Sequence, residues 1–353
     1  MAFANRKENY QAALIEYSNH QQKHWREHLK AQVCRNFGSI ENLNYLDTPD
    51  PTPKNDEILI KVRAIGVNFA DSLLVQGKYQ ASPPLPFVPG TEASGEIIAL
   101  GTDCKKYKVG DRVYGYNQAF GAFAEKVAFK EKIVSRLPEN LSFDEGAALL
   151  AATGTAHHAL RQKANLKENE TLVVLGAAGG TGSAAVQIGK AIGARVIAAC
   201  SSDSKLDFAK SLGADECINY SKEDLRTSIK NLTNGKGADV IYDTIGGDAF
   251  DASTRAITWN GRLLVVGFAS GRIPQFPVNL ALVKGFSIVG VFWGTFIEAE
   301  PELYENNRIE LQQWLANDIV KPKVNQRFHL ENCVDALKYI SNRKVLGKVV
   351  LNP

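Results

Sequence analysis

Residues 171–183 read TLVVLGAAGGTGS, an apolar run that stops abruptly in glycines and alanines. Residues 172–175 have the length and composition of a buried parallel strand, and the apolar positions of residues 184–192 recur with helical spacing. Glycines in the turn between them let the backbone approach a phosphate that a Cβ would keep away, and the N–H groups that begin the helix hold the anion. An ordinary strand-to-helix loop is the alternative. A second strand at residues 195–199, one crossover later, favours a dinucleotide pyrophosphate site.

Bulk properties indicate an ordinary globular protein of two domains. The chain has 353 residues, which is long for one hydrophobic core, with 44% hydrophobic and 22% charged residues. A net charge of +3, without a basic run interleaved with aromatics, indicates no nucleic-acid partner. The five cysteines lack CxxC spacing, which is typical of a reducing compartment. Because we find neither an apolar run of membrane-spanning length nor a signal-peptide core, we expect a cytoplasmic protein with no membrane partner.

Two patterns of secondary structure follow one another along the chain. Residues 9–30 are polar and predict a helix, after which short alternating runs bounded by Gly and Pro predict a mainly β, barrel-like domain up to residue 129. From residue 142 onward, short apolar strands alternate with helical stretches, which is the pattern of a doubly wound parallel sheet. The tail from residue 303 has helical stretches at residues 309–315 and 333–341 and a last strand at residues 347–351. It looks too short to fold alone, so we expect it to return to the first domain.

The end of the second strand of that sheet decides which nicotinamide cofactor fits. NAD sites place a carboxylate there, on the ribose hydroxyls, but this strand ends in Cys200, followed by Ser201 and Ser202. The missing acid, the two hydroxyls and the cation of Lys205 favour NADPH, whose 2′-phosphate an acid would repel. Asp203 could serve the ribose of NAD instead, although an N-cap for the following helix also explains it. Lys205, in turn, could be a solvated residue in the first turn of that helix.

Seven motifs occur in an order that resembles a known family. They are GVNFADSLLVQGKY (66–79), LPFVPGTEASGEI (85–97), VGDRV (109–113), GAAGGTG (176–182), INY (218–220), YDTIGGD (242–248) and RKVLGKVVL (343–351). Over residues 31–353 the chain resembles the zinc-independent quinone oxidoreductase (zeta-crystallin-like) branch of the medium-chain dehydrogenase/reductase superfamily. The resemblance implies an α/β fold with a GroES-like, mainly β catalytic domain, a doubly wound Rossmann cofactor domain and a cleft between them. We therefore expect an N-terminal helical extension (1–30), a catalytic domain (31–152 and 296–353) and an NADPH-binding domain (153–295).

Zinc alcohol dehydrogenases of the same superfamily hold their catalytic zinc with an early Cys, a Gly-His-Glu and a later Cys. Here Asn68 stands near the place of the first cysteine, the Gly-His-Glu has become Gly90-Thr91-Glu92, and residues 150–155 contain no Cys. The four-cysteine structural zinc cluster is missing as well. Because a catalytic zinc needs three protein ligands, Glu92 alone cannot hold one, and we expect no metal site here.

The resemblance also implies which residues meet NADPH. Residues 178–182 would hold the pyrophosphate, and Lys205 with Ser201 or Ser202 would pair with the 2′-phosphate. The full set implied for cofactor binding is Asn68, Thr155, Ala178, Gly179, Gly180, Thr181, Gly182, Ser201, Ser202, Lys205, Tyr220, Thr244, Gly267, Phe268 and Arg343. Tyr220 could instead be an ordinary half-buried aromatic, and Arg343 a surface turn residue.

The hydride comes from the cofactor, so the chemistry asks little of the side chains. A donor that stabilises the oxyanion formed on a quinone or enone carbonyl would help, with Tyr79 as the first candidate and Asn68 as the second. Phe69, Phe292 and Trp293, together with Tyr79, could line a slot for a planar substrate. The apolar run at residues 289–296 nevertheless predicts a strand that buries aromatics whatever the function.

Histidines outside these motifs form two groups. His20, His24 and His28 recur every four residues, so the predicted helix would align them on one face, where they could bind a transition metal. A straight helical row rarely closes a metal's coordination, which favours a solvated or docking face. For His157 and His158, just before the cofactor strand, packing or a surface role is favoured over catalysis.

Together these observations predict an NADPH-dependent oxidoreductase that reduces a quinone or an activated alkene (an enone or alkenal) without zinc. One alternative is an enoyl-thioester reductase, which needs cations for a coenzyme A or carrier arm that the sequence does not reveal. The other is a non-catalytic, crystallin-like protein that binds NADPH. The family is commonly dimeric through edge strands of the cofactor domain, and residues 262–268 and 286–292 are apolar enough to pair, so we expect a homodimer or higher homo-oligomer.

Overall fold

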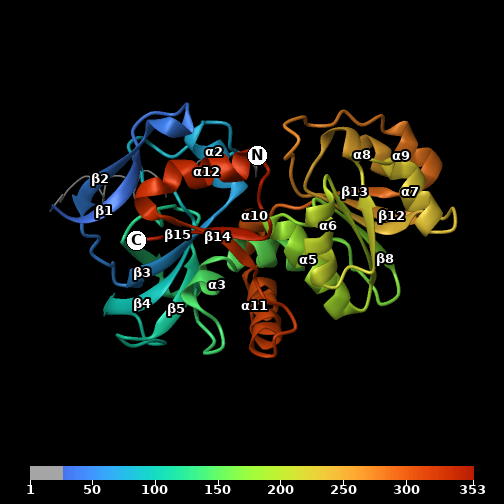
Figure 1. Ribbon diagram of the computed structural model, residues 1–353. Coiled ribbons are helices and arrows are strands. Elements are labelled where there is room, and N and C mark those ends of the chain that lie inside the picture. Colours follow the sequence, from blue (N-terminus) through green and yellow to red (C-terminus); the bar gives the residue numbers. More distant parts are fainter. Residues whose placement is uncertain (1–26) are drawn as a thin grey trace, which may run out of the picture. The chain divides into compact units, whose positions relative to one another are not determined.

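The computed structural model describes residues 27–353, which form two compact units (Figure 1). The first unit runs to Leu150 and is completed by Val324–Pro353, and the second is Ala151–Lys323. Each unit has its own hydrophobic core. The chain thus leaves the first unit once and returns to it for its last strands and helix, as the short tail predicted.

The first unit is a mainly β domain. Its strands are β1 (Glu27–Cys34), β2 (Leu43–Pro49), β3 (Glu57–Val67), β4 (Glu92–Leu100), β5 (Arg112–Tyr116), β6 (Lys126–Lys130), β7 (Val134–Arg136), β14 (Val324–His329) and β15 (Lys348–Asn352). Its helices are α2 (Phe69–Val75), α3 (Phe143–Ala147) and α12 (Cys333–Ser341), with short 3-10 turns η1 (Ile40–Asn42), η2 (Glu131–Ile133) and η5 (Leu330–Asn332).

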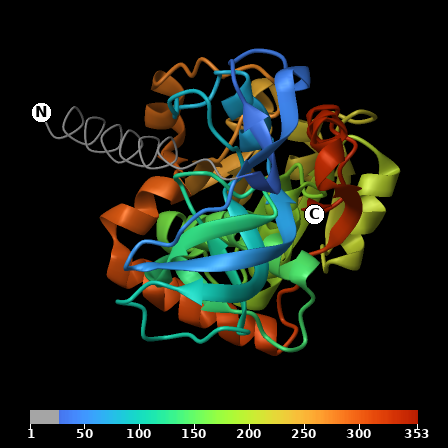
Figure 2. The same ribbon diagram turned by 90° about the vertical axis from the view of Figure 1, so that its left-hand side faces the viewer.

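A curved sheet of seven strands organises this unit. Its order is β14-β15-β3-β4-β5-β7, with β6 also paired to β3, while β1 and β2 form a separate antiparallel pair. β3 is long, with the burial pattern of a central strand, and it pairs with β4, β6 and β15. In Figure 2, which turns this unit toward the viewer, the blue to teal strands of the sheet run across the view. Since α12 packs against α2, β14 and β15, the last part of the chain helps to close the same core.

The second unit is a doubly wound α/β domain. Its strands are β8 (Thr171–Leu175), β9 (Arg195–Cys200), β10 (Glu216–Asn219), β11 (Ala238–Asp243), β12 (Ile257–Val265) and β13 (Ser287–Gly290). Its helices are α4 (Thr155–His158), α5 (Gly180–Ile192), α6 (Asp203–Ser211), α7 (Leu225–Leu232), α8 (Gly247–Ser253), α9 (Asn279–Lys284), α10 (Trp293–Ala299) and α11 (Pro301–Ala316). Two π-helical turns, η3 (Leu150–Gly154) and η4 (Ala159–Lys163), flank α4.

All strands of the second sheet are parallel, in the order β10-β9-β8-β11-β12-β13. Helices cover the sheet, as parallel sheets require, and β8 is therefore apolar, with Leu-Val-Val-Leu at its buried positions. The chain order reverses between β8 and β11. The predicted fold class is therefore confirmed in both units, including this switch point, beside which doubly wound sheets bind their ligands.

Four expectations differ from the structure. The helix predicted for residues 9–30 extends into a strand, because β1 begins at Glu27, so the backbone of His28 is in a strand. His20 and His24 lie outside the described residues. The expected strand at residues 289–296 is short, since α10 begins at Trp293. Residues 296–323 pack within the second unit, not the first. Finally, β12 lies inside the sheet, so of the two segments expected to pair between subunits only the one around β13 is at an edge.

Candidate functional site

The glycine turn of residues 176–182 lies at the switch point of the parallel sheet. It joins the end of β8 to the start of α5, and the end of β11 lies directly beside it. The Thr244 hydroxyl, just after β11, donates to the carbonyl oxygen of Leu175 at 2.9 Å. A Cβ on Gly176 would lie 2.6 Å from that hydroxyl oxygen. The two strand ends are therefore in contact, and most of the predicted cofactor residues of this unit lie at this carboxyl edge.

Two glycines of the turn are required by its geometry. Gly176 has a φ of +71°, in the left-handed region that favours glycine. A Cβ on Gly182 would lie only 2.2 Å from the carbonyl oxygen of Gly176, so this position in the first turn of α5 must lack a side chain. Gly179, the N-cap residue, has no such restriction, since its Cβ would meet the same oxygen at 3.4 Å. The sequence forms the tight turn because the helix must start against the end of β8.

The hydroxyls of the predicted set in this region face the protein. Thr181 Oγ1 lies 2.5 Å from the phenol oxygen of the buried Tyr242 and also donates to the carbonyl oxygen of Ala152. Thr155 Oγ1 donates to the carbonyl oxygen of Ala151 at 2.6 Å, within its own helix. The groups that remain for an anion are the backbone N–H groups at the start of α5, which a helix leaves without internal partners.

The end of β9 brings together the residues expected to choose the cofactor. Cys200 is its last residue and is 1% exposed, so a buried thiol occupies the place where NAD sites carry an acid. Burial raises the pKa of this thiol to about 11, which keeps it neutral at physiological pH. Lys205 Nζ donates to Ser201 Oγ at 3.3 Å, and Ser202 Oγ lies 3.2 Å from Ser204 Oγ. A cation and hydroxyls are thus grouped at this strand end.

Asp203, the acid that complicated this assignment, is occupied elsewhere. It is the first residue of α6, whose N-cap is Ser202, so the expected N-cap role of Asp203 is wrong. Its carboxylate accepts from Lys222 Nζ at 2.5 Å and from Asn219 Nδ2 at 2.7 Å. The hydrogen bond and charge of Lys222 hold the pKa of Asp203 below its usual range. The negative charge is therefore balanced on the β10 side of the helix.

Other predicted cofactor residues also follow strand ends. Tyr220, after β10, is half-buried against the core of the second unit, and its N–H donates to the carbonyl oxygen of Cys200 at 3.1 Å. The N–H of Gly267, after β12, donates to the carbonyl oxygen of Asp243 at 3.2 Å. Phe268 packs close to Gly246, where a Cβ would meet its ring at 3.0 Å. Ala178 is buried in the glycine turn itself.

The two aromatics expected in the substrate slot differ in their surroundings. Phe292 is 51% exposed, whereas Trp293 is 5% exposed in the first turn of α10. The indole packs against Gly154, where a Cβ would come within 2.4 Å of its ring, and meets Tyr304 edge-on with 6.2 Å between ring centroids. Trp293 therefore packs within the second unit, and its place in a substrate slot stays a prediction.

In the first unit, Asn68 belongs to a closed triangle of polar side chains. Lys348 Nζ donates to Asn68 Oδ1 and to Glu92 Oε1, both at 2.6 Å, and Asn68 Nδ2 donates to Glu92 Oε1 at 2.9 Å. The side chains of Glu92 and Lys348 are 1% and 5% exposed, whereas Asn68 is half-buried. Asn68 is thus the member of the triangle that reaches the surface of this unit.

The carboxyl of Asp71 is a fourth polar group, in contact with the backbone of Asn68. Its carboxyl accepts the backbone N–H of Asn68 at 2.7 Å and is 2% exposed. Burial, with a smaller contribution from the charge of Glu92, raises the pKa of Asp71 to about 7. The hydrogen bond from the N–H of Asn68 lowers this pKa, but by less than burial raises it. This carboxyl is therefore partly protonated at neutral pH.

The remaining predicted residues of the first unit have simpler surroundings. Tyr79 is half-buried against the cluster of Leu74, Ala81 and Phe120, and burial raises the pKa of its phenol, which therefore stays a hydrogen-bond donor. Phe69 is the half-buried first residue of α2. Arg343 is an exposed residue with a φ of +56° in the turn after α12.

His157 and His158 serve the packing of the second unit, as expected. His157 Nε2 lies 2.7 Å from Glu310 Oε2, on α11, and Arg161 binds the other oxygen of the same carboxylate. His158 stacks on Phe296 with 3.8 Å between ring centroids. Burial is the main cause that lowers the pKa of both, to about 4 for His158, so both rings are neutral at physiological pH.

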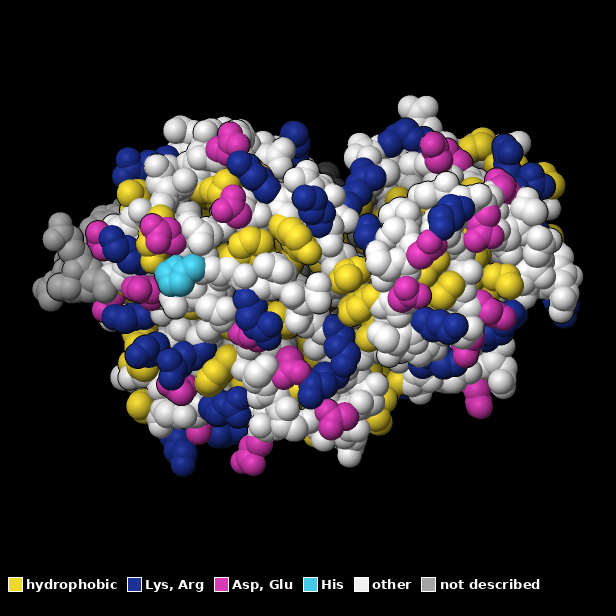
Figure 3. Space-filling model, in the orientation of Figure 1, with side chains coloured by type: hydrophobic (Ala, Val, Ile, Leu, Met, Phe, Trp, Pro, Cys, Tyr) yellow, Lys and Arg dark blue, Asp and Glu magenta, His cyan; other side chains and the backbone are white. Residues whose placement is uncertain are grey.

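The described residues contain neither a cluster that could hold a metal ion nor a helix that could span a membrane. No group of three or more His, Cys, Asp or Glu side chains within residues 27–353 is arranged to hold a metal ion. In the same range, no helix has the length and hydropathy needed to cross a membrane. On the face drawn in Figure 3, Lys and Arg side chains are interspersed with Asp and Glu over each unit.

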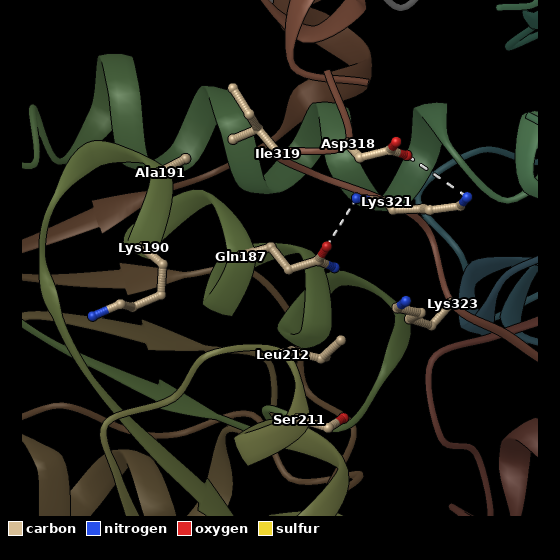
Figure 4. Close-up of a pocket in the computed structure, with 9 residues that line it drawn as sticks. All are labelled: Gln187, Lys190, Ala191, Ser211, Leu212, Asp318, Ile319, Lys321 and Lys323. Atoms are coloured by element: carbon tan, nitrogen blue, oxygen red, sulfur yellow. Dashed lines mark hydrogen bonds and ion pairs between the residues drawn. The ribbon is translucent and has the colours of Figure 1, made fainter. Parts of the chain in front are cut away.

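A surface depression of about 650 Å³ lies elsewhere in the second unit (Figure 4). It is lined by Gln187, Lys190, Ala191, Ser211, Leu212, Asp318, Ile319, Lys321 and Lys323. Lys190 binds Asp215 at 2.8 Å, and the ammonium of Lys321 lies 3.7 Å from Asp318. Because it lies at the last turn of α5, roughly 15 Å along the helix from the glycine turn, it is separate from the cofactor site.

Lys348 and Lys222 are the residues that the sequence analysis missed. Lys348 is the first residue of β15, and a lysine at the start of a strand is normally solvated. The available signal was Glu92 itself, because a carboxylate in an apolar segment needs a counter-charge. Lys222 gave no signal, since it is an exposed lysine in a loop.

Comparison with known proteins agrees with both units. The family described as alcohol dehydrogenase GroES-like domain matches residues 54–139, and the family described as zinc-binding dehydrogenase matches residues 180–307. The quinone oxidoreductase-like protein 2 homolog of Nematostella vectensis is 38% identical over 338 residues, which cover 93% of this chain and 90% of that protein.

Solved structures show the same likeness. Quinone oxidoreductase of Pseudomonas syringae pv. Tomato DC3000 matches with a TM-score of 0.86 and 31% identity, over 92% of this chain and 100% of that one. The Escherichia coli quinone oxidoreductase, solved as a complex with NADPH, matches with a TM-score of 0.85 and 29% identity over the same shares. The chain therefore belongs to the quinone oxidoreductase branch of the medium-chain dehydrogenase/reductase superfamily, as its seven motifs predicted.

Proposed function

We propose that this protein is an NADPH-dependent oxidoreductase that reduces a quinone or an activated alkene without zinc. The observation that carries the proposal is the end of β9, where a buried Cys200 replaces the acid of NAD sites and Lys205 lies against Ser201. The Escherichia coli relative was solved with NADPH, which supports the same cofactor. When bound, NADPH supplies a hydride from C4 of its nicotinamide.

Within this proposal, the residues of the second unit bind and orient the cofactor. The N–H groups of Gly180, Thr181 and Gly182 hold the pyrophosphate, because the helix start concentrates donors and the positive end of its dipole. Lys205 and Ser201 pair with the 2′-phosphate. Asp203 does not oppose this phosphate, since Lys222 and Asn219 already bind its carboxylate.

The residues of the first unit stabilise charge on the acceptor. Reduction of a quinone or enone carbonyl places negative charge on oxygen, and a fixed N–H or O–H donor lowers the barrier. Tyr79 carries a phenol that burial keeps protonated, and Asn68 carries an amide fixed by two partners. Neither residue needs to change its protonation state.

Independence from zinc rests on the donors around Glu92. An amide and an ammonium bind Oε1 of this carboxylate, and Lys348 already balances its charge. A catalytic zinc requires three protein ligands, which this cluster does not supply. Dialysis against 1,10-phenanthroline should leave the turnover unchanged; loss of activity that added zinc restores would contradict this part of the proposal.

The reaction is tested by following NADPH oxidation with 1,4-benzoquinone, an alkenal and crotonyl-CoA side by side. We expect turnover with the quinone or the alkenal and much less with the thioester, whose coenzyme A arm needs cations that the sequence does not reveal. Preference for crotonyl-CoA would favour an enoyl-thioester reductase. Tight NADPH binding without turnover on any acceptor would favour a binding protein instead.

The cofactor assignment is tested separately with Lys205→Ala. Loss of the ammonium should raise the KM for NADPH by about tenfold or more, because an ion pair with a phosphate contributes on the order of 1.5–3 kcal/mol, and should leave the KM for NADH nearly unchanged. Lys210→Ala, an exposed lysine at the other end of α6, is the matched control. Equal effects on both cofactors would show that Lys205 does not meet the 2′-phosphate.

We propose further that two copies pair through β13. This strand is at the edge of the sheet, and apolar side chains near it are exposed: Ile288 by 37%, Trp259 by 67% and Leu282 by 81%. An exposed apolar edge strand readily pairs with another chain. Sedimentation should give a dimer that Ile288→Lys weakens; a wild-type monomer at micromolar concentration would contradict the pairing.

A cytoplasmic location completes the proposal. All five cysteines are free thiols, and four of them are buried. Free thiols without disulfides are typical of a reducing compartment. Fractionation of cells should recover the protein with soluble cytoplasmic markers, and recovery with a membrane or an oxidising compartment would contradict it.

A further inference from the structure

Lys348 is a buried lysine to which the proposed function assigns only the balance of the Glu92 charge. Its side chain is 5% exposed and lies at the start of β15, which pairs antiparallel with the end of β3. Burying an ammonium is unfavourable unless hydrogen bonds and an opposite charge compensate it. Two compensating partners are present, Glu92 Oε1 and Asn68 Oδ1, each at 2.6 Å. The chain has therefore built a site for this cation beside Asn68.

Backbone geometry also accommodates the cluster. Glu92 begins β4 and pairs with Gly66 of β3. A Cβ on Gly66 would lie 2.4 Å from Glu92 Oε1 and 2.2 Å from the carbonyl oxygen of Ala147. Glycine at this position lets the carboxylate lie against β3, within reach of both Asn68 and Lys348.

The chemistry of the partners fixes the orientation of the Asn68 amide. An ammonium can only donate, so it must meet the oxygen of the amide, and a carboxylate can only accept, so it must meet the nitrogen. With Oδ1 used by Lys348 and one Nδ2–H used by Glu92, the second Nδ2–H is the group that Asn68 can offer to a ligand. Asn68 is also the half-buried member of the triangle, whereas Glu92 and Lys348 are almost fully buried.

We propose that Lys348 is a positioning residue that makes Asn68 a hydrogen-bond donor. Held by Glu92, its ammonium keeps Oδ1 turned inward, so that Asn68 presents N–H to an acceptor oxygen of the bound ligands. That oxygen belongs either to a ribose hydroxyl of the cofactor or to the carbonyl of the substrate. The inference rests on the proposed NADPH-dependent reaction and adds a residue that acts through Asn68.

Three variants show whether Lys348 orients the amide of Asn68 or only balances the charge of Glu92. Lys348→Met removes the donor to Oδ1 and leaves Glu92 unpaired. The double variant Lys348→Met, Glu92→Gln removes both charges, so it restores neutrality but not the donor. Lys126→Met is the matched control, because Lys126 also pairs with a carboxylate, Asp50, at 2.5 Å, but lies on β6, opposite Lys61 of β3.

Direct NADPH titration and kcat at saturating NADPH locate the acceptor oxygen. If the amide meets the cofactor, both Lys348 variants should raise the Kd for NADPH by about tenfold, as expected for a lost hydrogen bond to a buried polar group. If it meets the substrate, they should lower kcat/KM for the quinone by a similar factor with the Kd unchanged. Either result supports the positioning role. The same substitutions made in Asn68→Ala should then have no additional effect.

A readout without turnover keeps this inference separate from the proposed reaction. The side-chain NH₂ signals of Asn68, assigned with Asn68→Asp in ¹⁵N-labelled protein, should exchange with solvent at least tenfold faster in both Lys348 variants and be unchanged in Lys126→Met. Full recovery of exchange, Kd and kcat in the double variant would overturn the proposal, because Lys348 would then only neutralise Glu92. Wild-type exchange in folded Lys348→Met would overturn it as well. Absence of turnover in wild type would contradict the proposed reaction but not the anchoring of the amide.

Discussion

The glycine turn after β8 and the polar triangle after β3 both present hydrogen-bond donors, but they are built in different ways. The turn uses backbone N–H groups within seven consecutive residues, and its glycines exclude side chains from the phosphate site. The triangle uses side chains from residues 68, 92 and 348, which three adjacent strands bring together. A site made by local backbone tolerates change around it, whereas a site made by distant side chains depends on the register of a whole sheet.

The largest effect on the backbone site should come from Gly182→Ala. The new Cβ would lie 2.2 Å from the Gly176 carbonyl oxygen, so the turn must shift. Overpacking of this kind costs about 1–3 kcal/mol, and a loss of about 2 kcal/mol in binding corresponds to roughly a 30-fold weaker Kd for NADPH. Fluorescence titration and thermal unfolding measure the two effects.

Gly179→Ala is the control for this prediction, because its Cβ would meet the same oxygen at an ordinary 3.4 Å. Its thermal midpoint should stay at the wild-type value, whatever it does to cofactor affinity. If Gly182→Ala is as stable and binds NADPH as tightly as wild type, close packing at the helix start does not shape the site.

The same contrast decides what could be predicted from the sequence. The turn, its strand and its helix are contiguous, so residues 171–192 indicated both the fold and the ligand class. Cys200 and Lys205 lie one crossover further along the chain, and their place could be predicted from the sequence as well. The triangle was predictable only in part: Asn68 and Glu92 stand at or near positions where zinc alcohol dehydrogenases of the superfamily carry zinc ligands, but Lys348 needed the pairing of β15 with β3. The role of Trp293 depended on the start of α10 and on Gly154, which no local pattern indicates.

Each region also contains a buried carboxyl that should affect stability in its own pH range. Burial raises the pKa of Asp71 to about 7 and that of Asp243, beside the switch point, to about 6, in spite of the N–H groups that donate to them. An unfolded Asp has a pKa of about 3.9, so the folded chain binds protons that the unfolded chain has released. The free energy of unfolding contributed by these groups is therefore highest below about pH 4 and falls as pH rises to about 6 or 7.

Asp71→Asn should remove the part of this decline that extends to about pH 7, and Asp243→Asn the part that extends to about pH 6. One pKa unit corresponds to about 1.4 kcal/mol, so the expected changes are about 4 kcal/mol for Asp71 and about 3 kcal/mol for Asp243. Urea unfolding between pH 4 and 8 measures the slope. Asn keeps an acceptor for the backbone N–H groups, so the comparison isolates the charge. A slope unchanged in both variants would show that other groups control it.

A smaller effect is expected from Lys222→Ala, in the turn after β10. Removing Lys222 leaves Asp203 without its ammonium partner, close to the proposed 2′-phosphate site. Because the pair is largely exposed, its contribution is small, and the KM for NADPH should rise only about two- to fivefold, with no rise for NADH. A lower KM for NADPH would mean that Lys222 does not shield the phosphate from Asp203.

The most direct test of the account is isothermal titration of the wild-type protein with NADPH and NADH in the same buffer. The buried Cys200, the Lys205–Ser201 pair and the neutralised Asp203 predict a Kd for NADPH at least tenfold lower than that for NADH. Equal affinities, or tighter binding of NADH, would contradict the assignment of the cofactor and, with it, the proposed function.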